Sequence, residues 1–179
     1  IGPVFNHIAN TFVDAFVQAA QAVFPHAMVH WEDFGASNAH RILNRYRDEL
    51  CTFNDDVQGT AAVVAAAVMA GVSAKGERLR DQRIVISGAG TAGIGVADLL
   101  VDLMVSEGLT PEQARGLFWA TSSRGLVTDD PHLRFRDFQR PYARAIVETE
   151  DWAVDEPARI GLADIVRNVH PTVLIGTSG

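Results

Sequence analysis

Acidic residues stand in two short segments whose composition could bind a divalent cation. Glu32 and Asp33 form the first pair, between two aromatic residues, and Asp55 and Asp56 form the second, within Phe53–Thr60. Two carboxylates about 4 Å apart repel by roughly 4 kcal/mol at an effective dielectric constant of about 20, so a cation must lie between them if the segments converge. Mg²⁺ fits best, because it takes oxygen ligands and leaves positions for water or substrate. The alternative is that these acids begin helices or face the solvent.

A glycine-rich turn with the spacing of a dinucleotide site follows a predicted strand. The strand over residues 83–87 runs directly into Gly88-Ala89-Gly90-Thr91-Ala92-Gly93, and an apolar helix comes next. Gly88 permits the tight turn, Gly90 lets the backbone approach a pyrophosphate, and Gly93 allows the helix to pack closely on the strand. The amides at the start of the helix would face the phosphates. Without a ligand, the same pattern is an ordinary strand-to-helix turn.

The next predicted strand ends in hydroxyl groups and a cation instead of an acid. Ser122, Ser123 and Arg124 occupy the positions where an aspartate or glutamate commonly binds the adenosine ribose of NAD. Hydroxyls followed by an arginine suit a 2′-phosphate better than a free hydroxyl. Both NAD and NADP are therefore candidate coenzymes, with NADP favoured. The alternative is a solvated loop in which Arg124 contacts only water.

Helices and strands alternate along the chain and would position these residues. Hydrophobic periodicity predicts helices over residues 4–23, 36–46, 55–72, 92–107, 138–147 and 160–169, and strands over 27–31, 50–53, 83–87, 117–120 and 172–175. Asp55 and Gln58 have capping-box spacing, so Asp55 is expected to begin its helix. This alternation predicts an α/β fold with a Rossmann-like, doubly wound parallel sheet.

Composition limits the classes of partner. The chain has 179 residues and a net charge of −7 without a basic stripe, which argues against nucleic-acid binding. The alanine- and valine-rich stretch 61–72 is too short to cross a membrane, so no membrane partner is expected. Cys51 is the only cysteine and is expected to be a small buried residue; the lack of an intrachain disulfide favours a reducing, cytoplasmic location. Both ends look like cuts in a longer chain.

Several segments resemble, in order along nearly the whole chain, those of the malic enzyme family. They are Trp31-Glu32-Asp33-Phe34, Asn44-Arg45-Tyr46-Arg47, Phe53-Asn54-Asp55-Asp56-Val57-Gln58-Gly59-Thr60-Ala61, Gly88-Ala89-Gly90-Thr91-Ala92-Gly93-Ile94-Gly95, Arg124-Gly125-Leu126 and Ile175-Gly176-Thr177-Ser178-Gly179. The resemblance implies an internal fragment. Residues 1–54 would end a smaller α/β substrate and metal domain, and residues 55–179 would form an NAD(P)-binding domain that is incomplete at its C-terminus.

The resemblance also implies an activity and roles for particular residues. Malic enzymes oxidise malate with NAD or NADP and decarboxylate it to pyruvate and CO₂, using Mg²⁺ or Mn²⁺, and usually assemble as homodimers or homotetramers. The implied metal ligands are Glu32, Asp33 and Asp56. Asp55 is the implied catalytic aspartate, which lies beside the family's catalytic lysine and helps its proton transfer; its helix-capping role could coexist with this one.

The proton relay of the family is not matched in this chain. Its tyrosine and lysine lie upstream of the first acidic segment, and the only lysine here, Lys75, follows the second segment. The fragment alone is therefore expected to be inactive. One alternative is a nucleotide-binding or regulatory module that has lost catalysis. Another is a different dehydrogenase, such as an amino-acid dehydrogenase, but that class needs a lysine base and no group of three carboxylates.

Overall fold

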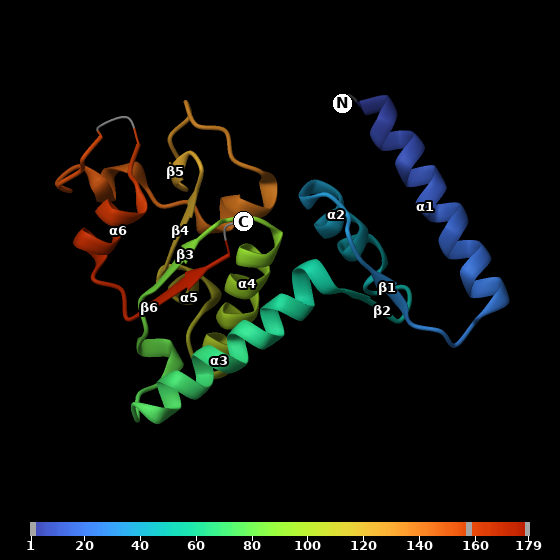
Figure 1. The fold of residues 1–179 in the computed structure, drawn as a ribbon, viewed down its shortest axis with the longest axis horizontal. Coiled ribbons are helices and arrows are strands. Elements are labelled where there is room, and N and C mark those ends of the chain that lie inside the picture. Colours follow the sequence, from blue (N-terminus) through green and yellow to red (C-terminus); the bar gives the residue numbers. More distant parts are fainter. Residues whose placement is uncertain (1–2, 157–158, 178–179) are drawn as a thin grey trace.

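The computed structural model describes residues 3–156 and 159–177, with side chains described for residues 11–35, 38–156 and 159–177. Figure 1 shows a smaller unit at the N-terminal end beside a larger unit built on a twisted sheet. Helix α1 lies at the outer side of the smaller unit, and helix α3 extends from the smaller unit along the larger one. The chain is therefore mixed α/β, as its alternating pattern predicts.

The smaller unit consists of two helices and two parallel strands. Its elements are α1 (Pro3–Val23), β1 (Val29–Trp31), α2 (Ala36–Tyr46) and β2 (Thr52–Asn54). In the parallel pair, Val29 lies opposite Thr52 and Trp31 lies opposite Asn54. Both strands therefore end at the same edge. A compact core of Val13, Val17, Trp31, Ile42 and Tyr46 holds the helices against them.

The larger unit is a four-stranded sheet covered by helices. Its elements are α3 (Thr60–Ala74), η2 (Leu79–Asp81), β3 (Ile84–Ser87), α4 (Thr91–Ser106), α5 (Pro111–Arg115), β4 (Phe118–Ser122), β5 (Gly125–Leu126), η3 (Asp137–Tyr142), η4 (Ile146–Thr149), α6 (Leu162–Val169) and β6 (Val173–Gly176). The strand order is β5-β4-β3-β6, and β3 pairs in parallel with β4 and β6. The chain leaves β3 towards β4 and later returns to its other side. This is the switch point where doubly wound sheets bind their ligands.

Two expectations about this unit are wrong in detail. Strand β5 pairs antiparallel with β4, because Ser123 and Arg124 form a two-residue hairpin between Ser122 and Gly125. The helix expected over residues 138–147 is instead two short 3₁₀ segments, η3 and η4. Pro141 lies inside that range and lacks the amide that an α-helix needs there.

The helix after the second acidic segment begins at Asp55 as expected, but its cap lies one residue earlier. Asn54 is the cap: its side chain accepts from the Val57 amide at 3.0 Å, and the Gln58 side chain accepts from the Asn54 amide at 3.0 Å. Asp55 is therefore not the cap. The first turn, η1 (Asp55–Gly59), is π-helical, and this wider turn lets Gln58 close the capping box from one position further along.

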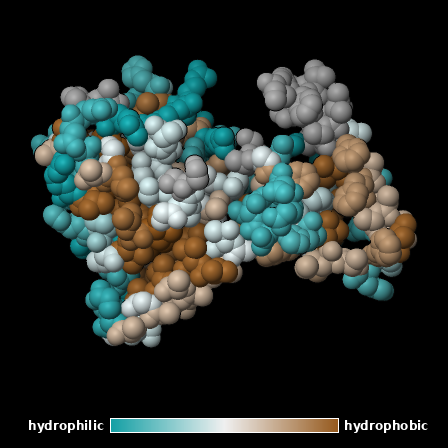
Figure 2. Space-filling model, in the orientation of Figure 1, coloured by the Kyte–Doolittle hydropathy of each residue, from teal (hydrophilic) through white to brown (hydrophobic). Residues whose placement is uncertain are grey.

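The same helical segment corrects the expectation about membrane-spanning length. Residues Asp55–Ala74 form one continuous helix of 20 residues with a mean hydropathy of 1.7, long and apolar enough by those criteria to cross a membrane. Helices in the core of a protein can have the same length and composition. Ala61 and Ala65 are buried against the larger core, whereas Val63 is 72% exposed and Met69 45% exposed. Figure 2 shows apolar residues gathered over this part of the surface.

Candidate metal and coenzyme sites

The two acidic segments meet at the shared edge of β1 and β2. Glu32 and Asp33 directly follow β1, and Asp55 and Asp56 directly follow β2. One carboxylate oxygen from each of Glu32, Asp33 and Asp56 can be chosen so that all three lie within 4.8 Å of one another. The three residues expected to bind a metal are thus brought together by the register of two short strands.

The cluster has the chemistry that a hard divalent cation requires. Among the described residues, no basic side chain forms an ion pair with Asp33 or Asp56. The backbone of Asp33 has a φ of 59°, a left-handed conformation that is uncommon for a residue with a side chain and concentrates at functional sites. Glu32 and Asp33 are exposed and Asp56 is half-buried, so this edge remains accessible for an ion with bound water or substrate.

His30 joins this edge, although its sequence position gave no reason to expect it. The histidines show no metal-binding spacing, yet His30 precedes Trp31 on β1 and its Nε2 lies 3.2 Å from a Glu32 carboxylate oxygen. His30, Glu32 and Asp55 also each offer one atom within 4.8 Å of the others. Strand pairing is the signal that could have predicted the position of His30. In the β1–β2 register His30 lies opposite Phe53, two residues before Asp55.

The Asp55 carboxylate folds back over its own helical turn. A Cβ atom added to Gly59 would lie 1.9 Å from Asp55 Oδ1 and 3.4 Å from the Phe53 ring. Only glycine leaves room for this conformation unless the aspartate moves. Gly59 thus fixes where the Asp55 carboxylate can lie at the end of β2.

Some backbone amides of the glycine-rich turn donate to β4, and others lie at the start of α4. The amides of Gly88 and Ala89 both donate to the Thr121 carbonyl, at 2.9 and 2.8 Å, which ties the turn to β4. Gly90 is the N-cap of α4 and, having no side chain, forms no side-chain hydrogen bond with the helix end. Because the first amides of a helix lack partners within it, the amides from Gly90 to Gly93 are the ones available to an anion.

Three glycines of this turn differ in backbone conformation and in the space around them. Gly88 has a φ of 111°, which a side chain would disfavour. A Cβ atom on Gly93 would lie 2.1 Å from the Gly88 carbonyl oxygen and 2.9 Å from the Ile86 side chain, so helix and strand pack too closely for any other residue. A Cβ atom on Gly90 would meet nothing within 4 Å. The space above Gly90 is therefore open, as a pyrophosphate requires.

A close contact joins the metal edge to the start of α4. A Cβ atom on Gly95 would lie 2.5 Å from the Val57 carbonyl oxygen and 3.1 Å from Val57 Cγ1. Gly95 therefore lets α4 pack directly on η1, the turn that carries Asp55 and Asp56. The candidate metal site and the candidate coenzyme site are therefore joined by the contact between η1 and α4.

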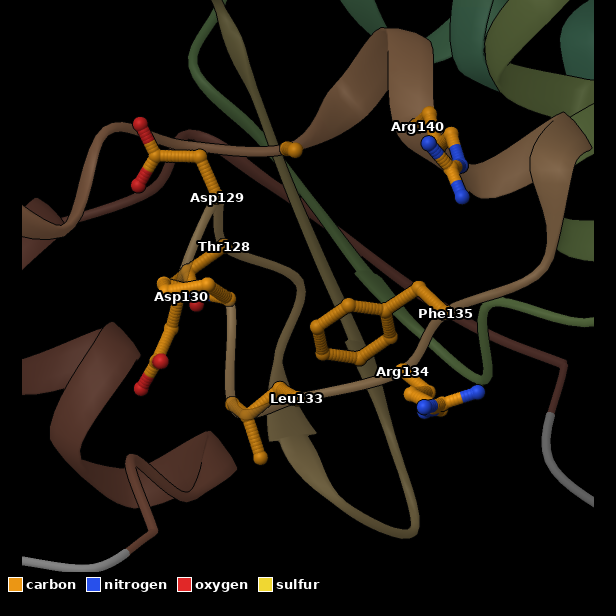
Figure 3. A pocket seen from close by; sticks show the side chains of 9 residues that line it. Thr128, Asp129, Asp130, Leu133, Arg134, Phe135 and Arg140 are labelled. Atoms are coloured by element: carbon orange, nitrogen blue, oxygen red, sulfur yellow. The ribbon is translucent and has the colours of Figure 1, made fainter.

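The loop expected to contact the ribose is a tight hairpin. Ser122 Oγ accepts from the Arg124 amide at 3.1 Å, and the Arg124 guanidinium donates to the Arg134 carbonyl. Arg134 lines a cavity of about 630 Å³, where Figure 3 shows Asp129 and Asp130 on one side and Arg134 and Arg140 on the other. Both signs of charge line this cavity. Arg124 therefore has a protein partner in this structure.

A half-buried histidine between the two units was not expected from the sequence. The His40 ring on α2 stacks on Phe138, with ring centroids 4.6 Å apart and an interplanar angle of 18°. Burial lowers the pKa of His40, while Asp98 and the Thr91 backbone oppose that shift. Burial also raises the pKa of Asp98, against the effect of the Tyr142 hydroxyl, which donates to it at 2.6 Å. Residues 44 to 98 positions apart in the sequence thus meet here.

The family profile described as "Malic enzyme, NAD binding domain" matches residues 57–179, more than half of the chain. The chain belongs to the malic enzyme family. A second profile, "Malic enzyme, N-terminal domain", matches residues 6–47. The malic enzyme resemblance of the sequence motifs is therefore confirmed, together with an NAD-binding domain of Rossmann-like α/β fold.

Named relatives are similar along almost the entire chain. It is 50% identical over 168 residues to "NAD-dependent malic enzyme 3" of Bacillus subtilis, which covers 93% of this chain and 30% of that protein. It is 47% identical over 167 residues to "Putative malate oxidoreductase [NAD]" of Mycobacterium tuberculosis, with the same two coverages. The chain thus spans about 30% of the length of these curated relatives.

A solved structure supports the fold. The NAD-dependent malic enzyme of Thermotoga maritima superposes with a TM-score of 0.69 at 23% identity, covering 94% of this chain and 40% of that one. The fold of this chain is therefore one that a solved malic enzyme structure also has.

Proposed function

We propose that this chain supplies the metal ligands and part of the coenzyme site of an enzyme that oxidises and decarboxylates malate to pyruvate and CO₂. The observation that carries the proposal is the meeting of Glu32, Asp33 and Asp56 within 4.8 Å at one edge of a parallel strand pair. Malic enzyme membership and the names of the relatives supply the reaction. We place the boundary between the substrate domain and the coenzyme domain between residues 54 and 55.

The carboxylates would hold a Mg²⁺ or Mn²⁺ ion. When bound, such an ion supplies Lewis-acid chemistry to an α-hydroxy acid. The three acids orient it from two sides, because they come from different strands. Asp55 lies next to this group and is assigned to proton transfer with a lysine from outside this chain. Lys75 cannot serve, because it follows the far end of the 20-residue helix Asp55–Ala74, about 30 Å from Asp55 at about 1.5 Å of rise per residue.

The coenzyme would bind at the end of β3, with its pyrophosphate over Gly90 and the start of α4. We assign NAD to this site. The relatives are named as NAD-dependent, which gives no support to the NADP preference expected from Ser122–Arg124. The Arg124 contact to the Arg134 carbonyl is compatible with NAD, because it commits Nη1 of the guanidinium to a protein partner. We also propose a cytoplasmic homodimer or homotetramer without a membrane partner.

The test is an activity assay on the whole protein that carries this chain. We expect malate- and Mn²⁺-dependent reduction of NAD, and slower reduction of NADP. The 179-residue chain by itself should show no turnover, because the family's lysine and tyrosine are not matched in it. Turnover of malate by the isolated chain would refute the assignment of the proton relay to residues outside it, and absence of NAD reduction by the whole protein would refute the proposed reaction.

A further inference from the structure

The orientation of the carbonyl oxygens in the glycine-rich turn affects phosphate binding as much as the orientation of its amides does. An anion is stabilised by amides aimed at it and destabilised by a carbonyl oxygen facing it, since that oxygen carries partial negative charge. The Gly88 and Ala89 amides are bound to Thr121. The carbonyls of the same two residues lie one and two positions before Gly90, where the pyrophosphate is proposed to bind. Whatever fixes these two carbonyls decides whether the turn attracts or repels a phosphate.

Each carbonyl is held by a side chain from a distant element. The Thr177 hydroxyl, just after β6, donates to the Gly88 carbonyl at 2.7 Å. The Gln139 side-chain amide, in η3, donates to the Ala89 carbonyl. Gln139 is 7% exposed, so this hydrogen bond is shielded from water. Two consecutive carbonyls are thus bound by side chains from two different segments.

Gln139 also has an ordinary structural role, which allows the two roles to be separated. Its Oε1 accepts from the Arg136 amide at 2.7 Å and closes a capping box at the start of η3. Gln113 makes the same kind of bond at α5, where its Oε1 accepts from the Thr110 amide at 2.9 Å. Glutamate serves equally well in a capping box. The donation from Nε2 to the Ala89 carbonyl is what a glutamate in place of Gln139 would lose.

We propose that Gln139 is a positioning residue for the coenzyme: it holds the Ala89 carbonyl away from the bound pyrophosphate, and Thr177 does the same for the Gly88 carbonyl. The inference rests on the proposed coenzyme site. It gives a function to the segment 128–159, which carries no coenzyme motif of its own. Because Gln139 acts through the backbone, it affects coenzyme affinity and leaves the metal edge unchanged.

The test measures NADH binding by fluorescence to the whole protein, with thermal unfolding and Mn²⁺ binding as separate readouts. Gln139→Glu keeps the bond to the Arg136 amide and replaces the donor with a carboxylate oxygen. We expect NADH affinity to fall at least about tenfold, from the lost hydrogen bond and the added negative charge, with Mn²⁺ affinity unchanged. The melting temperature should also fall, because the buried carboxylate faces a carbonyl oxygen. Gln113→Glu is the matched control and should bind NADH like the wild type.

A second pair of variants tests the same idea if Gln139→Glu does not fold. Thr177→Val removes the hydroxyl at nearly constant shape, and Thr177→Ser retains it. The inference expects weaker NADH binding by the valine variant and near wild-type binding by the serine variant. Equal NADH affinity of the wild type, Gln139→Glu and Thr177→Val overturns the inference alone. A wild-type protein that does not bind NADH overturns the proposed function, and the inference with it.

Discussion

Trp31 lies directly opposite Asn54 in the parallel pair β1–β2, and both side chains are buried, at 3% and 0% exposure. The residues that follow each of them are acids. The register of these two three-residue strands therefore places both acidic segments at the same end of the strand pair. A shift of one residue would turn alternate side chains to the opposite face and separate the carboxylates.

Gly95 should be essential for the contact between α4 and the turn that carries Asp55 and Asp56. We expect Gly95→Ala to destabilise the protein by about 1–3 kcal/mol, because its Cβ atom would lie 2.5 Å from the Val57 carbonyl oxygen. Gly71→Ala is the matched control: it lies in α3 with nothing within 4 Å, and should stabilise by about 0.5–1 kcal/mol. Denaturant unfolding measures both, and the same sign for both variants would contradict this packing.

His40 should make stability depend on pH. Its pKa is lowered from the ordinary value of 6.5 by burial, so the unfolded chain takes up a proton that the folded chain resists. The free energy of unfolding is therefore free of this His40 penalty above about pH 6.5. It decreases as the pH drops from there towards the folded-state pKa of His40. Asp98 faces His40, and Arg47 and Asp102 line the same cavity. These three charged residues are present in every variant compared below.

The variant His40→Phe isolates this effect, since it keeps a ring against Phe138 and removes the titrating group. Melting temperatures measured between about pH 7.5 and about pH 5.5 span the range in which an unperturbed histidine changes charge. The decline should be smaller for His40→Phe than for the wild type. The exposed His132→Gln serves as the control and should follow the wild type. Parallel declines in all three proteins would rule out the burial of His40 as their cause.

Ser122 offers a direct test of the coenzyme assignment. An aspartate at this position, the end of β4, could accept from the ribose hydroxyls of NAD and would repel the 2′-phosphate of NADP. We expect Ser122→Asp to reduce kcat/KM with NADP by at least about tenfold, a loss of about 1.4 kcal/mol, while NAD is retained. Arg124→Ala should leave NAD reduction unchanged. If Arg124→Ala instead abolished a strong NADP activity, the NAD assignment would be wrong.

Local patterns in the sequence predicted most elements, because single segments determine them. The apolar spacing of residues 36–46 coincides with the bounds of α2, and the strand before Gly88 ends at Ser87 as expected. The segment 137–149 could not be predicted in this way. Its periodicity resembles a helix, but Pro141 and the contact of Gln139 with the coenzyme turn favour two 3₁₀ segments.

The candidate site was predictable where a motif carried it and not where a tertiary contact did. Glu32, Asp33 and Asp56 were found from their residue types and from the family resemblance. Asn54 was missed as the helix cap because η1 is a π-turn, whose extra residue moves the capping box by one position. Gln139 lies 50 residues from its partner carbonyl, and no local pattern reports such a contact.

The metal edge is tested most directly by calorimetric titration of Mn²⁺ into the whole protein. We expect one site in the wild type and affinity at least about tenfold weaker in Asp56→Asn, since even residues that only support metal ligands commonly change affinity by about 10–100-fold. Asp48→Asn, an exposed acid on the same unit, should bind Mn²⁺ like the wild type. Unaltered Mn²⁺ affinity in Asp56→Asn would contradict the assignment of these three carboxylates as metal ligands.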